Sequence, residues 1–172
     1  MKIGVDASEL LKSLEEAKQK IKNKLEFMVQ EVVYDALAVP AIDITPYGDL
    51  EKFYSLYEYR NKTFRLPMAA GLAKGGWSIN FNINPNYGSG SEYVDTASGS
   101  LSKSRIQSQL DQYKLGNIIN LYNATSYVSF NFNGKSLESG YSPQAPQGIR
   151  IPTIDAFMGL YKGVMQRALS NV

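Results

Sequence analysis

The side chains that could do chemistry in this chain are carboxylates, amines and hydroxyls, because both histidine and cysteine are absent. Without histidine there is no common general base, and Ser–His or Cys–His catalysis is excluded. Without cysteine there is no disulfide, thiol nucleophile or thiolate metal site. Two carboxylates suffice for glycoside hydrolysis, but no spacing joins a pair among Glu92, Asp95, Asp111, Glu138 and Asp155. We therefore expect no enzyme, no catalytic residue, no cofactor and no metal.

Ligand-binding loops and surfaces give only weak signals. The glycine-containing segments 72–76 and 87–91 lack the lysine and hydroxyl offset of a phosphate-binding loop. Interleaved tyrosine and asparagine could stack on sugars or on single-stranded bases. Few basic residues flank these aromatics and the net charge is +2, so the phosphate contribution would be small. A carbohydrate- or nucleic-acid-binding module with a Tyr/Asn-rich surface remains the alternative function.

The segment LESGYSPQAPQG, residues 137–148, is dense in conformationally special residues. Pro143 and Pro146 fix φ and lower the entropy of the unfolded turn. Gly140 and Gly148 allow backbone geometries that other residues avoid. Such a loop is preorganised and loses little entropy on docking. The segment can equally serve as a tight connection into a helix, with Glu138 as a local cap, and the two roles are compatible.

A long helix is predicted over residues 6–39. Its apolar residues recur at spacings of three, four and seven, as expected for one buried stripe: Leu11, Leu14, Ile21, Leu25, Met28 and Val32. Leu25 and Met28 are expected in the core. Pro40 is expected to end the helix, because proline disfavours helical geometry in the preceding residue. The alternative is that one end projects and packs on a neighbouring subunit.

The remaining elements predict an α+β fold with a small antiparallel sheet packed against the long N-terminal helix and a C-terminal helix. Strands are expected over 75–83 and 117–123, a helix over 102–116, and a hairpin turn at the Asn-Gly pair 133–134. The strand that begins at Trp77 should bury that side chain. The last helix follows Pro152 and should bury Phe157 and Tyr161. We expect one domain over residues 1–172.

Residues 47–70 form a segment rich in aromatic side chains. Four of them are candidates for a partner contact: Phe53, Tyr54, Tyr57 and Tyr59. Large aromatic rings favour the centres of interfaces. The segment could be a short helix or an irregular arm, and a satellite hydrophobic cluster is nearly as good an interpretation as a contact surface.

The segment 137–148 resembles the E-x-G-x-S-x-Q-A-P-x-G signature of tailed-phage neck proteins, the head–tail joining or tail-completion proteins that include the minor-tail-protein Z-like group. The matching residues are Glu138, Gly140, Ser142, Gln144, Ala145, Pro146 and Gly148. The contact residues implied by the resemblance, together with the rigidity of the turn, are Glu138, Gly140, Ser142, Pro143, Gln144 and Pro146.

The order of the other motifs is similar to that of the same family. Thr45-Pro46 is followed by a glycine step, Gly71–Trp77, that enters a strand at its tryptophan, and a turn at Asp95–Gly99 precedes a helix. Tyr127 keeps the family tyrosine, whereas the neighbouring Pro and Ala are replaced. Two stretches, the aromatic arm 47–70 and a hairpin insertion at 130–135, depart from the family pattern. They imply a divergent member with contacts of its own.

The resemblance implies a virion structural protein. Such a protein forms a ring of identical subunits, expected to be six-fold, between the portal-side connector and the tail tube. It acts as a neck or tail-completion (terminator) protein and leaves a channel through which DNA passes without sequence-specific binding. The implied location is the head–tail neck of the virion, and the host cytoplasm during assembly. No apolar run is long enough for a membrane span, so no membrane partner is expected.

Overall fold

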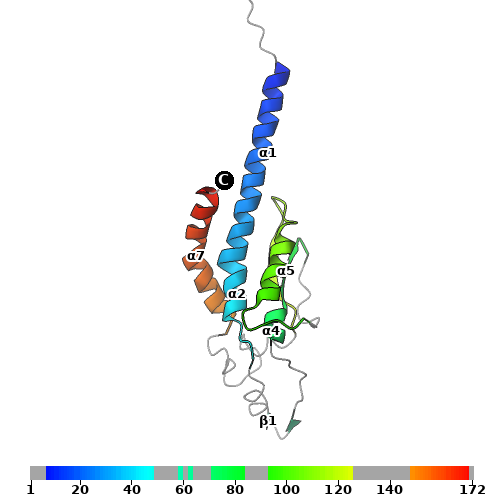
Figure 1. The fold of residues 1–172 in the computed structure, drawn as a ribbon, viewed down its shortest axis with the longest axis vertical. Helices are drawn as coiled ribbons and strands as arrows, with labels where there is room; N and C mark the ends of the chain where they lie inside the picture. The colour runs from blue at the N-terminus through cyan, green and yellow to red at the C-terminus, as the bar shows by residue number, and fades with distance from the viewer. Residues whose placement is uncertain are drawn as a thin grey trace, which may run out of the picture.

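The structure, a computed structural model, describes residues 7–48, 71–83, 93–125 and 148–170, together with the backbone of two short strands at 58–59 and 62–63. Its described part is mainly helical, with a long N-terminal helix, a long C-terminal helix and a two-stranded antiparallel sheet between residues 77 and 123. The predicted α+β class is confirmed. The elements gather around the lower half of the N-terminal helix, and its upper half extends beyond them (Figure 1).

The N-terminal helix has three parts: α1 (Ala7–Glu31), the π-helix η1 (Val32–Ala38) and α2 (Val39–Ile44). The prediction that the helix ends at Pro40 is wrong, because Pro40 lies in the first turn of α2. Proline in a helix lacks an N–H donor and its ring clashes with the carbonyl one α-turn earlier. The π-helical turn is wider and moves that carbonyl, since Val39 N–H bonds to Tyr34 O, five residues back. The chain therefore continues as a helix to Ile44.

The sheet consists of β3 (Trp77–Phe81) and β4 (Ile119–Asn123), antiparallel with Trp77 opposite Asn123. The one-turn helix α4 (Leu72–Gly75) leads into β3, and α5 (Ser100–Leu110) connects the two strands. β3 packs against α5, and α5 packs against η1 and α2. The sheet and α5 thus form one side of the body of the molecule.

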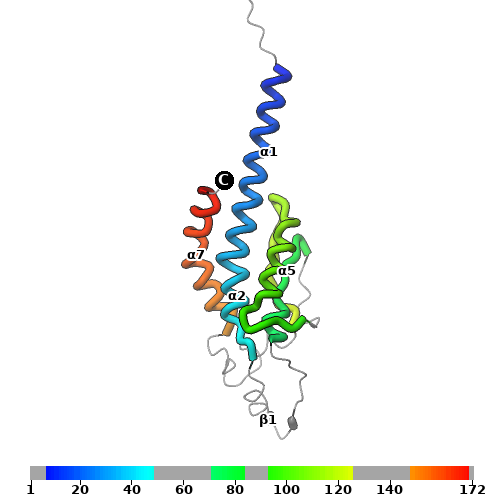
Figure 2. Tube along the Cα trace, in the orientation of Figure 1, coloured from blue at the N-terminus to red at the C-terminus, as the bar shows by residue number. Residues whose placement is uncertain are grey.

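The C-terminal helix α7 (Arg150–Ser170) covers the other side of η1. The trace shows α7 beside the lower half of the N-terminal helix and running in the opposite direction (Figure 2). An ion pair of 3.4 Å joins Arg167 Nη2 to Asp35 Oδ2 across this contact. The N-terminal helix is therefore the central element, with α7 on one flank and α5 with the sheet on the other.

The core lies where these flanks meet the second half of the N-terminal helix. It contains Ala38, Ala41, Ile42, Ala73, Trp77, Ile79, Ile106, Leu110 and Ile149. Trp77 is 9% exposed. The expectation that Leu25 is a core residue is wrong: it is 36% exposed, because this turn of α1 is covered on another side, where Glu26 is buried and accepts a hydrogen bond from Leu115 N–H. Met28, Phe157 and Tyr161 are half-buried and outside the central cluster.

The aromatic segment contains one described feature. Strands β1 (Glu58–Tyr59) and β2 (Lys62–Thr63) pair antiparallel, with Tyr59 opposite Lys62. A helix over these residues, one of the two expectations, is therefore wrong. The rest of 49–70, the Asn-Gly pair and the insertion at 130–135 lie outside the described residues.

Candidate functional site

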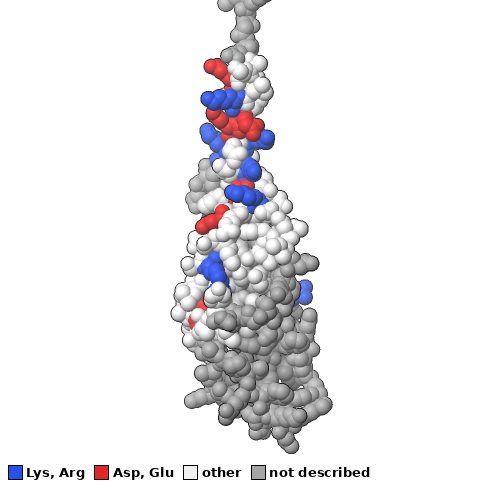
Figure 3. Space-filling model, turned by 90° about the vertical axis from the view of Figure 1, so that its right-hand side faces the viewer, with Lys and Arg blue, Asp and Glu red and all other residues white. Residues whose placement is uncertain are grey.

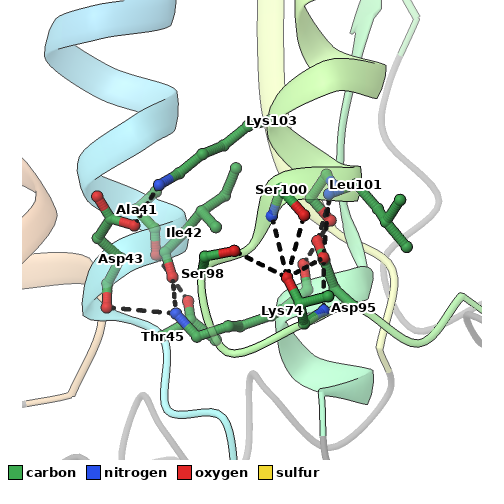
Figure 4. A network of polar contacts seen from close by, with 12 residues as sticks. Ala41, Ile42, Asp43, Thr45, Lys74, Asp95, Ser98, Ser100, Leu101 and Lys103 are labelled. Atoms are coloured by element: carbon green, nitrogen blue, oxygen red, sulfur yellow. Dashed lines mark hydrogen bonds and ion pairs between the residues drawn. The ribbon is translucent and has the colours of Figure 1, made fainter.

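A buried polar network joins segments that are far apart in the sequence (Figure 4). Trp77 Nε1 donates a 2.8 Å hydrogen bond to Thr45 Oγ1, and Thr45 Oγ1 donates in turn to Ala41 O at 2.7 Å. Buried indole and hydroxyl groups need such partners. The bonds fix the start of β3 to the end of α2.

Lys74, the third residue of α4, is 4% exposed. Its amine donates to Ile42 O at 2.7 Å and to Asp43 O at 3.4 Å, two carbonyls at the C-terminal end of α2. A positive charge there is favoured by the helix dipole. Burial lowers the pKa of the Lys74 amine, Asp43 and Asp95 act in the opposite direction, and Lys103 adds to the lowering. The amine caps the helix.

Asp95 caps the other helix of the network, α5. Its carboxylate accepts hydrogen bonds from the N–H groups of Thr96 at 2.7 Å, Leu101 at 3.0 Å and Ser102 at 2.7 Å. The first N–H groups of a helix have no partner inside the helix, so this carboxylate stabilises the start of α5. Burial alone would raise the pKa of Asp95, but the hydrogen bonds from Ser102, Leu101 and Thr96 outweigh burial and lower it.

The backbone of Asp95 lies in close contact with that of Gly71, just before α4. Gly71 has a φ of +85°, and a Cβ at this position would lie 2.0 Å from the carbonyl oxygen of Asp95. Only glycine fits there without strain. Ser102 Oγ donates to Lys74 O at 2.7 Å, and Arg105 Nη2 donates to the carbonyls of Gly75 and Trp77 at 2.6 and 2.5 Å. The network therefore binds α4, β3 and α5 into one unit.

This network is a structural feature and has no arrangement suited to catalysis. The amine of Lys74 is directed at helix carbonyls, and the carboxylate of Asp95 is occupied by backbone donors. Among the residues that the structure describes, no three His, Cys, Asp or Glu side chains are grouped as a metal site. In the same part of the chain, no helix is long and apolar enough to cross a membrane.

The projecting half of α1 is the main exposed apolar feature. Residues 7–25 are all exposed, and the large apolar side chains among them are Leu10, Leu11, Leu14, Ile21 and Leu25. Acidic and basic side chains lie close together over this half of the helix in the space-filling view (Figure 3). One ion pair of 3.3 Å, Lys18 with Glu15, is on its surface. Exposed apolar side chains in a row indicate a contact surface.

A second exposed apolar face lies on α7. Its inner side chains Thr153, Val164 and Ala168 are buried toward the body. Its outer side chains include Ile151, Ile154, Met158 and Leu169, which are 48–61% exposed. Gly159 and Gly163 are on the same helix, and a Cβ at either would have nothing within 4 Å. The outer face of α7 is therefore apolar and open.

Most of the contact residues predicted from the sequence lie outside the described residues: Glu138, Gly140, Ser142, Pro143, Gln144, Pro146, Phe53, Tyr54 and Tyr57. Tyr59 is described only as part of the backbone of β1. Gly148, the last signature residue, has a φ of +72°, which favours glycine, and precedes the buried Ile149. Within the described ranges, the motifs Thr45-Pro46, Gly71–Trp77 and Asp95–Gly99 come together in the polar network.

Sequence reasoning missed the roles of Lys74 and Arg105. Their partners are about 30 positions away in the chain, so no local spacing could indicate them. The cap by Asp95 was also not readable from the sequence, because a capping residue is expected immediately before the helix, where Gly99 stands.

Comparison of the chain with protein-family models, with curated proteins and with solved structures gives no match.

Proposed function

We propose that this chain is a structural protein of a tailed-phage virion, one subunit of a ring at the head–tail joint. In this role it would join the portal-side connector to the tail and leave a channel for DNA. Its partners would be identical subunits in a ring, expected to be a hexamer, and the neighbouring connector and tail-tube proteins. Its mechanism is assembly, not catalysis.

One observation carries the proposal: the described sequence pieces that resemble the neck-protein family meet in one place. Thr45 hydrogen-bonds to Trp77, and Gly71 approaches Asp95 closely. This arrangement supports the proposal that these pieces form one structural unit, as the resemblance implies. The exposed apolar faces of α1 and α7 are also what a subunit of a larger assembly would carry.

The direct test is electron microscopy of phage particles produced without this chain. If it joins heads to tails, such particles should be found as separate DNA-filled heads and finished tails. Supplying the chain in trans should restore whole particles. Joined, infectious particles in its absence would contradict the proposal.

The segment 137–148, for which the sequence predicts a rigid turn, can be tested in the same assay. A chain with Pro143→Ala and Pro146→Ala, and a second chain with Gly140→Val, should fold normally but restore fewer whole particles. Melting temperature and incorporation into particles separate folding from docking. Normal incorporation of both variants would exclude this turn as a docking element.

The alternative, a carbohydrate- or nucleic-acid-binding module, makes a different prediction. The purified chain would then bind glycans, or bind oligonucleotides in a strongly salt-sensitive way. In the structure, the exposed Tyr93 lies beneath Arg105, with 4.7 Å between the guanidinium carbon and the ring centre. We expect no such binding from a structural ring subunit.

A further inference from the structure

The projecting half of α1 carries apolar side chains on one side only. Leu11, Leu14, Ile21 and Leu25, with Lys18 between them, are separated alternately by three and four residues; we call these five residues the α1 seam. Alternating spacings of three and four are typical of a helix that packs lengthwise against another helix. The α1 seam is exposed, and most of it lies beyond the flanking elements that the structure describes. Its partner should therefore be a helix of another molecule.

We infer that the α1 seam packs on the outer face of α7 in a second copy of this chain. The inference rests on the proposed function, because a closed ring needs two different and complementary surfaces on each subunit. Pairing of one α1 seam with another would be isologous and would end at a dimer. The outer α7 face offers the second surface: Ile151, Ile154 and Met158 are exposed and also follow a spacing of three and four.

Charges beside the two surfaces favour one direction of packing. In α1, Glu15 and Lys22 are exposed and seven residues apart; in α7, Asp155 and Lys162 are exposed and also seven residues apart. Antiparallel helices would place Glu15 beside Lys162 and Lys22 beside Asp155. Parallel helices would place these positions on opposite edges of the contact, where no such pairs could form. Opposite charges at such flanking positions set the orientation of helix pairs, so the α1 seam should run antiparallel to the neighbour's α7.

The same geometry already exists within one chain. The inner face of α7 packs antiparallel against the lower half of the N-terminal helix, with Arg167 paired to Asp35. The outer face of α7 would add the neighbour's α1, so that each α7 would lie between two antiparallel helices.

The two registers imply a displacement between copies. Within one chain, Arg167 of α7 lies opposite Asp35 of the N-terminal helix. In the proposed contact, Lys162 of α7 lies opposite Glu15 of the neighbour's α1. The neighbour's helix is therefore displaced along α7 by about 25 residues, or about 37 Å at 1.5 Å per residue, relative to the chain's own helix. A shift of this size excludes helices that run along the ring axis, because the copies in a closed ring are not displaced along that axis.

Disulfide cross-linking can test the contact, because the chain has no cysteine. Ile21→Cys and Met158→Cys are placed on the two proposed surfaces, where the native side chains are 59% and 61% exposed. Equal amounts of the two single variants are mixed and oxidised mildly. We expect at least a ten-fold higher yield of disulfide-linked heterodimer than from the control mixture of Ile21→Cys with Ile118→Cys, since Ile118 is 67% exposed but lies beside the sheet.

The chain that carries both Ile21→Cys and Met158→Cys should give a ladder of linked oligomers that ends at the ring size. Circular dichroism checks that each variant folds; Leu25→Cys with Ile154→Cys replaces the pair if either fails. Heterodimer at only the control yield would overturn the inference. Self-linking of Ile21→Cys alone, at the yield of the mixture, would also overturn it in favour of an isologous α1 pair.

Charge reversal gives an independent readout. Glu15→Lys in the Ile21→Cys chain should lower the heterodimer yield several-fold, and Lys162→Glu in the Met158→Cys chain should restore it. No restoration would count against the antiparallel register. These outcomes are separable from the proposed function: a chain required at the neck that fails to cross-link refutes this contact alone. A cross-linked ring that particles do not require refutes the neck function alone.

Discussion

The lower body of the molecule and the projecting half of α1 share one helix but differ in what surrounds it. In the body, residues such as Ile42 and Leu110 are at most 2% exposed, and the helix end is capped by the buried amine of Lys74. In the projecting half, Leu11 and Leu14 are more than half exposed. The same residue type therefore contributes to folding in one region and is left for association in the other.

An apolar stripe in a sequence thus indicates which face of a helix favours burial, but not which element or molecule covers that face. Most of the stability of a helix in a protein comes from the packing of its apolar face, and in the projecting half that face is exposed. The projecting half is continuous with η1 and α2, which are packed between α7 and α5, and this attachment supports its helical form. The body thus supplies the stability, and the projecting half supplies the surface.

The same leucine-to-alanine substitution in both regions should have very different effects on stability. Leu110→Ala removes a buried side chain and should lower the free energy of unfolding by about 2–5 kcal/mol, from the transfer term and the cavity left behind. Leu14→Ala removes a side chain that is 57% exposed and should change it by less than about 0.5 kcal/mol. Urea denaturation at concentrations where the chain is monomeric measures both. Similar losses for the two variants would show that α1 is covered within the single chain.

A smaller effect is expected at the cap of α5. Asp95→Ala leaves the N–H groups of Thr96, Leu101 and Ser102 without their partner and should cost about 1–2 kcal/mol. Asp111→Ala, an exposed acid just past the other end of α5, is the matched control and should cost little. A cost at Asp111 equal to that at Asp95 would contradict the capping role.

The pH dependence of the same group follows from its lowered pKa. A carboxyl whose pKa is lower in the folded than in the unfolded state stabilises the fold above the unfolded value, near 3.8, and loses this contribution as pH falls through the folded pKa. The unfolding free energy of the wild-type chain should therefore fall more steeply below about pH 5 than that of Asp95→Asn. If the unfolding free energies of the two chains fell equally with pH in this acid range, the hydrogen-bond donors would not be what keeps the Asp95 carboxylate ionised.

The smallest expected effect is a gain. Gly159→Ala and Gly163→Ala each place a methyl group in open space on α7 and should stabilise the chain by about 0.4–1 kcal/mol, since glycine weakens a helix interior. Thermal denaturation of the monomer measures the gain. A loss of stability would mean that the outer face of α7 is already covered within the chain.

Local patterns in the sequence predicted the elements better than their surroundings. The alternation after Gly76 placed β3, and the apolar stripe placed α1. Leu25 was misplaced because periodicity is the same for a buried stripe and a projecting one. Pro40 was wrongly expected to end the helix, because the rule that proline disfavours helix before it does not take account of the wider π-helical turn that precedes it here. The cap by Lys74 was invisible, since its partners are supplied by folding and not by sequence neighbours.

The π-helical segment η1 also determines where the upper part of the helix points. Adding or removing one residue in an α-helix turns everything beyond it by about 100°. Because η1 (Val32–Ala38) holds more residues in each turn than the α-helices on either side, it fixes the azimuth of α1 relative to the body. Deletion of one residue within η1 would keep every leucine of the upper helix exposed. It would rotate them together about the helix axis, so that they would face a different direction relative to the body. The segment η1 therefore sets the rotational orientation of the projecting half of α1 relative to the packed body.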